Sequence, residues 1–139
     1  MNIKIKRLHP NAVIPKYAKP GDAAMDLTVT SKDWTGTHDF VTYSFGIALE
    51  IPEGYVGLIF PRSSIYKTGQ MLTNSVGVID SGYRGELKAV MTNDPALRYN
   101  VGDRAAQIII IPYPQVTFEE VAELSDSDRG AGGFGSTGK

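Results

Sequence analysis

The stretch Ile47-Ala-Leu-Glu-Ile-Pro-Glu-Gly-Tyr-Val-Gly-Leu-Ile-Phe60 indicates the fold class of this chain. Ile47, Leu49 and Ile51 alternate with smaller or charged residues, which is the period-two pattern of a half-buried strand. The turn-forming tripeptide Pro52-Glu53-Gly54 follows, and the alternation then resumes to the end of the stretch. The stretch therefore predicts two strands joined by a turn.

The same pattern recurs on both sides of this stretch. Ile3 and Ile5 alternate with lysines, and residues 87–92 alternate in the same way. With 15 Gly and 8 Pro in 139 residues, long helices have few places to form. Only residues 63–68 are predicted as a short helix, with Ser63 as its cap. The sequence predicts an all-β jelly roll or sandwich, with further turns at residues 20–22, 81–83, 93–95 and 100–103.

The run Ile108-Ile109-Ile110-Ile111 departs from this alternation. A continuous apolar run of strand length is typical of a strand that is buried on both faces. We therefore expect either a second sheet or a neighbouring subunit to cover this strand.

Composition excludes several classes of function. A formal net charge of −1 gives no long-range attraction to nucleic acid or to an anionic membrane. The chain has no Cys and only 2 His, so neither a disulfide framework nor a thiolate zinc site is available. The N-terminal residues alternate apolar and charged side chains and have no apolar run of signal-peptide length. We expect a soluble, cytoplasmic protein with no nucleic-acid or membrane partner.

The glycine-rich tail, residues 125–139, is predicted to be disordered. It matches the spacing of both common nucleotide-binding glycine motifs, but the helix that each motif requires is missing because the chain ends there. Glycine amides, hydroxyls and an arginine are nevertheless suited to phosphate, and a lone aromatic side chain is suited to stacking on a base. The residues alone leave two alternatives open, a nucleotide-binding flap and a solubilising tail.

Two further segments are candidate sites. Pro61-Arg62-Ser63-Ser64 places a guanidinium and two hydroxyls at the start of the predicted helix, where an anion is favoured, although an ordinary serine cap would look the same. Asp80 follows an apolar strand and precedes a Ser-Gly turn. Its carboxylate could be aimed at a ligand by the turn, or it could simply cap the turn.

Together with the remaining segments, these residues resemble the trimeric dUTPases, the deoxyuridine triphosphate nucleotidohydrolases. The resemblance spans the chain, because motifs similar to all five of the family occur in the family's order. They are Asp22-Ala-Ala-Met-Asp26-Leu27, Pro61-Arg62-Ser63-Ser64, Gly77-Val-Ile-Asp80-Ser-Gly-Tyr83-Arg-Gly-Glu86, Gly102-Asp103-Arg104-Ala-Ala-Gln107 and Arg129-Gly-Ala-Gly-Gly-Phe134-Gly-Ser136-Thr137-Gly138.

The resemblance implies a homotrimer of jelly-roll subunits. Residues 1–124 would form the jelly roll, and residues 125–139 would form a flap that closes over an active site of a neighbouring subunit. The implied reaction is hydrolysis of dUTP to dUMP and pyrophosphate, by attack of water on the α-phosphorus with Mg²⁺ bridging the triphosphate. This activity limits uracil incorporation into DNA and supplies dUMP for dTMP synthesis.

The resemblance also assigns residues to roles. Asp80 is implied to be catalytic, as the group that orients and deprotonates the water, and Asp26 to hold the metal through its water shell. Tyr83 is implied to pack on the deoxyribose and to exclude ribonucleotides. The remaining implied contacts are to substrate: for the base Asn74, Gly77, Val78, Ile79 and the stacking Phe134, and for the phosphates Arg62, Ser63, Ser64, Gln107, Arg129, Gly135, Ser136 and Thr137.

Three alternatives stay open at this stage. A dCTP deaminase of the same superfamily would need a glutamate beside the exocyclic amine, on the hairpin that here carries Asp80 and Tyr83. A nucleotide-binding regulatory protein with a protein partner would keep the fold without needing turnover. A structural jelly roll would give no reason for the motifs.

Overall fold

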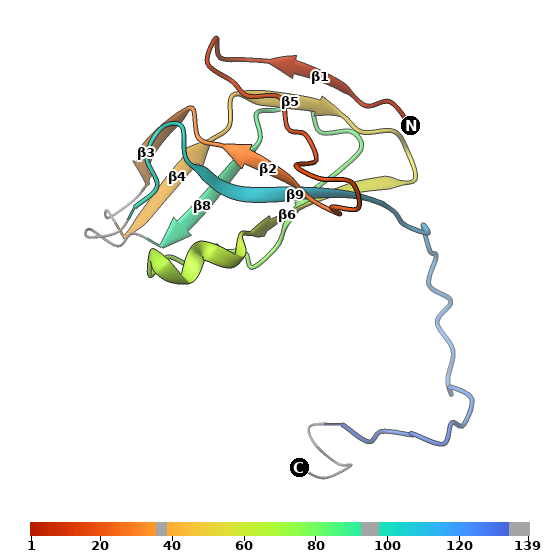
Figure 1. Cartoon of the computed structure of the whole chain (residues 1–139). Helices are drawn as coiled ribbons and strands as arrows, with labels where there is room; N and C mark the ends of the chain where they lie inside the picture. The colour runs from red at the N-terminus through yellow and green to blue at the C-terminus, as the bar shows by residue number, and fades with distance from the viewer. Residues whose placement is uncertain (36–38, 93–97, 134–139) are drawn as a thin grey trace.

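A computed structural model describes residues 1–35, 39–92 and 98–133. Its strands form three antiparallel sheets, β1–β5, β2–β9–β6–β7 and β3–β4–β8 (Figure 1). The prediction of an all-β fold is confirmed. The elements are β1 (Lys4–Arg7), β2 (Met25–Thr28), β3 (Ser31–Thr35), β4 (Phe40–Ser44), β5 (Ile47–Glu50), β6 (Tyr55–Pro61), the 3₁₀ helix η1 (Ser63–Lys67), β7 (Gly77–Ile79), β8 (Lys88–Thr92) and β9 (Arg104–Pro112).

The turns lie where glycine, proline and aspartate punctuate the sequence. Backbone hydrogen bonds close turns at residues 19–22, 52–55, 80–83 and 100–103. Gly54 and Gly102 have φ values of +79° and +93°, which glycine adopts without steric cost. The turn predicted at residues 93–95 lies outside the described residues.

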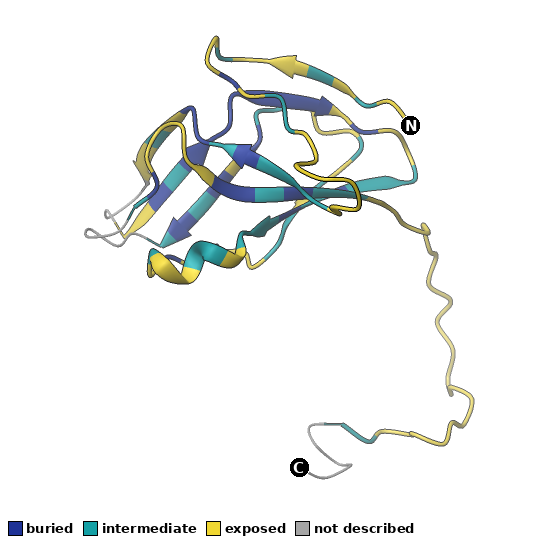
Figure 2. Cartoon of the chain, viewed as in Figure 1, coloured by how far each residue is buried: buried dark blue, intermediate teal, exposed yellow. Residues whose placement is uncertain are grey.

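The core lies between the sheets and consists of inward-facing strand residues (Figure 2). Tyr43 and Phe45 are its largest fully buried side chains, and Ile47, Leu87 and Met91 are also fully buried. The predicted alternation therefore holds in β8, whereas in β5 Ala48 is buried as well. Tyr43 brings its hydroxyl into the core, where it donates to Gln70 Oε1 at 3.1 Å and accepts from the Tyr99 amide at 3.2 Å.

Within one chain the isoleucine run of β9 is fully buried only at Ile108, and its cover by a neighbouring subunit stays a prediction. Ile108 is 1% exposed and faces the core, but Ile111 is 38% exposed. Within one chain the run is therefore not buried on both faces. Its outward face continues across the four-stranded sheet through apolar residues, of which Val78 and Ile111 are exposed and the others half-buried: Val56, Leu58, Phe60, Val78, Ile109 and Ile111.

The predicted short helix is present, but it is a 3₁₀ helix and its cap differs from the prediction. Arg62, not Ser63, occupies the N-cap position, and no side-chain hydrogen bond caps the helix. The Pro61-Arg62 backbone leaves β6 in an extended conformation and Ser63 is the first helical residue, so the helix begins one residue earlier than a cap at Ser63 would require. Arg62 is therefore held at a strand end.

The chain leaves the body after β9. Residues 113–124, which we call the arm, form no strand or helix and run away from the sheets (Figure 1). Phe118 and Leu124 in the arm are 96% and 87% exposed. Among the described residues, no helix is both long and apolar enough to span a bilayer.

Candidate functional site

Asp26 is the centre of a charged cluster on the four-stranded sheet. In the register of this sheet, Asp26 in β2 lies opposite Gln107 in β9, and Gln107 lies opposite Phe60 in β6. Asp26 Oδ1 accepts a hydrogen bond from Arg62 Nε at 2.6 Å, and Asp26 Oδ2 accepts one from Arg104 Nη1 at 3.0 Å. One carboxylate thus faces two guanidinium groups, and the cluster keeps an excess positive charge.

Arg62 is oriented by this cluster. Its Nη2 lies 3.5 Å from Asp26 Oδ2, and its Nη1 donates to the Arg104 carbonyl oxygen at 3.3 Å. A guanidinium has five N–H donors, so about two remain for another acceptor. Because the Arg62 side chain is only 25% exposed, its geometry is fixed by the protein before any ligand arrives. The cluster is suited to a phosphate oxygen.

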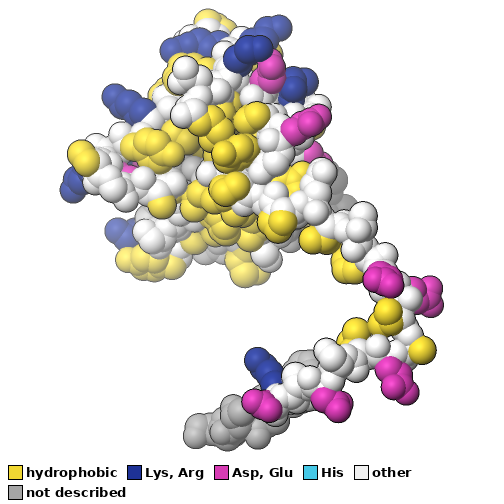
Figure 3. Space-filling view, turned by 90° about the vertical axis from the view of Figure 1, so that its right-hand side faces the viewer, with side chains coloured by type: hydrophobic (Ala, Val, Ile, Leu, Met, Phe, Trp, Pro, Cys, Tyr) yellow, Lys and Arg dark blue, Asp and Glu magenta, His cyan; other side chains and the backbone are white. Residues whose placement is uncertain are grey.

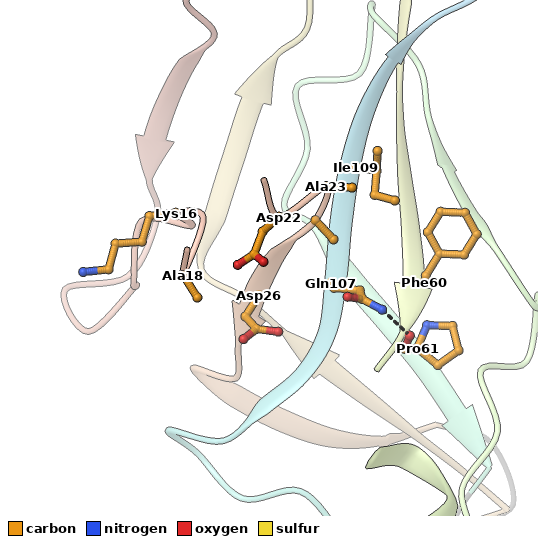
Figure 4. A pocket seen from close by; sticks show the side chains of 10 residues that line it. Lys16, Ala18, Asp22, Ala23, Asp26, Phe60, Pro61, Gln107 and Ile109 are labelled. Atoms are coloured by element: carbon orange, nitrogen blue, oxygen red, sulfur yellow. Dashed lines mark hydrogen bonds between the residues drawn. The ribbon is translucent and has the colours of Figure 1, made fainter. Parts of the chain in front are cut away.

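A cleft of ≈ 640 Å³ opens beside the cluster (Figure 4). Gln107 projects into it and donates from Nε2 to the Pro61 carbonyl oxygen at 2.9 Å, as the dashed line in Figure 4 shows. Asp22 and Asp26 both line the cleft, and Lys16 lies at its edge. The described residues hold no group of three or more side chains that could bind a metal ion by themselves. A metal bound at Asp26 would therefore need further ligands from water, from a substrate or from another copy of the chain.

Ser63 and Ser64 lie on η1, directly after Arg62. Ser63 is exposed and Ser64 is half-buried, and both follow Arg62 at the end of β6. Tyr99 packs beneath this helix, where burial raises the pKa of its phenol and the positive charge of Arg62 acts in the opposite direction. The position of both serines agrees with a phosphate-binding segment.

Asp80 and Tyr83 belong to a second site. Asp80 directly follows β7 and is exposed, and the turn after it is closed by the Tyr83 amide, which donates to the Asp80 carbonyl oxygen at 3.1 Å. The carboxylate of Asp80 makes no hydrogen bond or ion pair with the described residues, so it does not cap the turn. A hollow of ≈ 280 Å³ lies here, lined by Val78, Ile79, Asp80, Tyr83, Glu86 and Lys88.

Asn74 lies at the other end of β7. A β-carbon added to Gly77 would be 3.6 Å from Asn74 Nδ2, so the amide lies over the start of the strand. Between them Ser75 has a φ of +59°, which is unusual for a residue other than glycine. Gly77, Val78 and Ile79 pair with β6 on one side only, so the outer edge of β7 presents free backbone groups to a ligand.

Within one chain the two sites are far apart. In the strand register, Asp26 lies level with Phe60 of β6, through Gln107 in β9. Ile79, the residue before Asp80, lies level with Gly57 of β6. Asp80, one residue beyond Ile79, is therefore offset from Asp26 by four residues and three strand spacings, which corresponds to about 14 Å along the strands and about 14 Å across them, or roughly 20 Å in all. A single phosphate group cannot contact both carboxylates of one chain.

The tail residues are only partly described. Arg129 Nε donates to the Gly132 carbonyl oxygen at 3.1 Å, in a turn beyond the arm. Figure 1 shows that this part of the chain lies away from the sheets. Phe134, Gly135, Ser136 and Thr137 lie outside the described residues. No contact between the tail and its own chain's sites is present in the described part.

The sequence analysis assigned no role to three residues that the geometry brings to these sites. Arg104 binds Asp26 across 78 residues of sequence, Lys16 borders the large cleft, and Glu86 lines the small hollow. Arg104 could have been found from its place in the motif that ends with Gln107. No sequence pattern marked Lys16.

Comparison with known proteins gives a consistent result. A family model described as dUTPase matches residues 10–138. The deoxyuridine 5'-triphosphate nucleotidohydrolase of Thermobifida fusca is 44% identical over 99% of this chain and 79% of its own, and that of Rhodococcus erythropolis is 43% identical over 99% and 87%. A solved structure of the Staphylococcus bacteriophage 80alpha dUTPase with dUPNHPP superposes with a TM-score of 0.84, at 27% identity and 99% coverage of both chains.

Proposed function

This chain belongs to the dUTPase family and is a dUTP diphosphatase, and we propose that it works as a homotrimer whose sites combine residues of different copies. The observation that carries the proposal is the separation of the Asp26 cluster from Asp80 within one chain. A site shared between copies can bring the Asp26 cluster and Asp80 together. The resemblance to the trimeric dUTPases implies sites of this kind.

The partly exposed apolar face of the four-stranded sheet supports an assembly. Phe60 and Ile109 lie on this face next to Gln107, and Val78 lies on it beside Asp80. Packing one copy's sheet against another would bury this face and would place sites at the boundary of the contact. Figure 3 shows hydrophobic side chains gathered on the body near the departing arm, and the exposed apolar residues of the arm also suit contact with another copy.

The phosphate end of the substrate fits the Asp26 cluster. Arg62 offers its remaining N–H donors, and the hydroxyls of Ser63 and Ser64 and the amide of Gln107 provide further donors nearby. Asp26 and Asp22 supply carboxylate oxygens beside this position, which suits Mg²⁺ because this ion keeps several waters and relies on substrate phosphates. When bound, Mg²⁺ would neutralise charge on the triphosphate.

Asp80 is the proposed base. Its exposed carboxylate is free of protein partners among the described residues, so it can accept a proton from a water molecule held in line with the α-phosphorus. The oxygen of this water forms the new bond to phosphorus, the bond to the pyrophosphate oxygen breaks, and dUMP and pyrophosphate leave. Positioning and charge neutralisation supply most of the acceleration.

The base and sugar fit the β7 hairpin. Asn74 and the free backbone edge of Gly77, Val78 and Ile79 can pair with uracil, and Tyr83 lines the hollow in which we expect the deoxyribose to pack. We assign the tail as a flap on a neighbouring copy, with Phe134 stacking on the base and Arg129, Gly135, Ser136 and Thr137 closing over the phosphates. Only a triphosphate would offset the entropy of ordering this flap.

The deaminase alternative is not favoured. Glu86 is the glutamate on this hairpin, and its carboxylate accepts from the Gly46 amide at 3.0 Å and lies 3.5 Å from Lys88 Nζ. A carboxylate engaged in this way is not free to exchange protons with a pyrimidine. The dUTPase activity would limit uracil in DNA and supply dUMP for dTMP synthesis, which fits a protein of the cytoplasm.

The test is hydrolysis of dUTP, dCTP, dTTP and UTP in parallel with Mg²⁺, with products identified by chromatography. We expect rapid formation of dUMP and pyrophosphate from dUTP alone. Formation of dUTP or dUMP from dCTP would instead establish the deaminase, and no reaction with any of the four would favour a binding protein.

A further inference from the structure

The ring of Tyr83 occupies space that exists only because residue 85 is glycine. A β-carbon added to Gly85 would lie 2.5 Å from Tyr83 Cζ and 2.8 Å from Cε2, and closer still to the hydroxyl oxygen. Real β-carbons do not approach other atoms this closely. Gly85 has no positive φ, so its backbone does not by itself require glycine.

The ring is also tied to the body through Glu86. The Tyr83 hydroxyl donates to the Glu86 carbonyl oxygen at 3.1 Å. Glu86 is in turn fixed by its own side chain, which accepts from the Gly46 amide at 3.0 Å, and by the next residue, because the Leu87 amide donates to the Ile47 carbonyl oxygen at 2.9 Å. The Glu86 carbonyl oxygen, which accepts from Tyr83, is therefore held in place relative to β5 and the core.

We propose that Gly85 is a specificity-determining residue that acts by setting the position of Tyr83 against the sugar. This inference rests on the proposed function, in which Tyr83 excludes a 2′-hydroxyl. The clash of a residue-85 side chain is with the end of a rotatable side chain and not with backbone, so the ring would move while the fold stays intact. Moving the ring opens the hollow where the sugar packs.

Gly85→Ala tests the inference, and Gly82→Ala is the matched control. Gly82 lies in the same loop, has no positive φ, and a β-carbon added there would meet no atom within 4 Å. We expect Gly85→Ala to lower the ratio of kcat/KM for dUTP to that for UTP by about tenfold or more, because rejection of an added hydroxyl by shape is worth about a hundredfold. Gly82→Ala should keep the wild-type ratio.

A double variant shows whether Gly85 acts through Tyr83. In a Tyr83→Ala background, adding Gly85→Ala should leave the ratio unchanged, since no ring remains to be displaced. A further fall in the double variant would overturn the inference, as would an unchanged ratio in Gly85→Ala. Tyr83→Phe, which removes only the bond to Glu86, provides a second route: it should lower the ratio by less than Gly85→Ala does.

Assays of the wild-type protein distinguish a failure of this inference from a failure of the proposed function. If the wild type hydrolyses dUTP and rejects UTP while Gly85→Ala keeps the same selectivity, only the role of Gly85 is refuted. If the wild type hydrolyses both nucleotides equally well, the assignment of Tyr83 and the role of Gly85 fail together.

Discussion

Replacing Asp80 with asparagine separates catalysis from folding and from binding. The substitution keeps the size of the side chain and removes its charge and its ability to take a proton. Since the carboxylate makes no hydrogen bond or ion pair with the described residues and is exposed, the free energy of unfolding should change by no more than about 0.5 kcal/mol. For a chain of this size that corresponds to a shift of about 1–3 °C in Tm.

The effect on turnover should be large. A positioned general base contributes about 10²–10⁴-fold, so kcat for dUTP should fall by roughly that factor. The Asp26 cluster and the β7 edge are unchanged, so affinity for a non-hydrolysable imido analogue of dUTP should stay within about threefold of the wild type, a difference below about 0.7 kcal/mol.

The assay combines steady-state pyrophosphate release, calorimetric binding of the imido analogue and thermal melting. Asp33→Asn, an exposed position on β3, is the matched control and should retain full activity. Near-wild-type turnover in Asp80→Asn would refute the assignment of the base. A large fall in Tm would show instead that Asp80 is structural.

Three further perturbations have defined outcomes. Tyr43→Phe leaves Gln70 Oε1 and the Tyr99 amide without their partner in the core. The free energy of unfolding, measured by denaturant titration, should therefore fall by about 2–4 kcal/mol. A change below about 0.5 kcal/mol would show that the core relaxes to satisfy both groups. Deleting residues 125–139 should remove most dUTP hydrolysis and leave the melting temperature unchanged. A fall in melting temperature as large as that of a core variant would contradict the flap assignment. Arg62→Lys loses the paired bonds to its carboxylate partner, so KM for dUTP should rise about tenfold or more, and an unchanged KM would exclude phosphate contact.

The sequence predicts the strands well because their patterns are local. Period-two alternation in Ile47–Phe60 predicts that both segments are strands, as β5 and β6 are, but not which residues are buried: Ala48 is buried in β5, and in β6 the buried residues are Gly57 and Ile59. The isoleucine run is less informative. Its pattern predicts that Ile109 and Ile111 are shielded from water, but it does not say whether the cover comes from the same chain or from another.

The site shows a second limit of sequence reasoning. Motif residues such as Asp26 and Asp80 can be picked from sequence, but their distance depends on strand order, which the alternation does not specify. The cap at Ser63 failed because the direction in which β6 ends, and not the preference of serine, places the first helical residue. The pairing of Arg104 with Asp26 depends on the register between β2 and β9, which has no local signal.

The central claim is that each site takes Asp26 from one copy and Asp80 from another. Asp26→Asn and Asp80→Asn chains, each nearly inactive alone, can be co-expressed with different tags, and mixed trimers can be purified through both tags. With cyclic symmetry, one site in each mixed trimer joins two intact carboxylates, so the dUTP hydrolysis rate should recover to about one third of the wild-type rate. Mixed trimers no more active than either variant alone would place both carboxylates of a site on one copy and contradict the account.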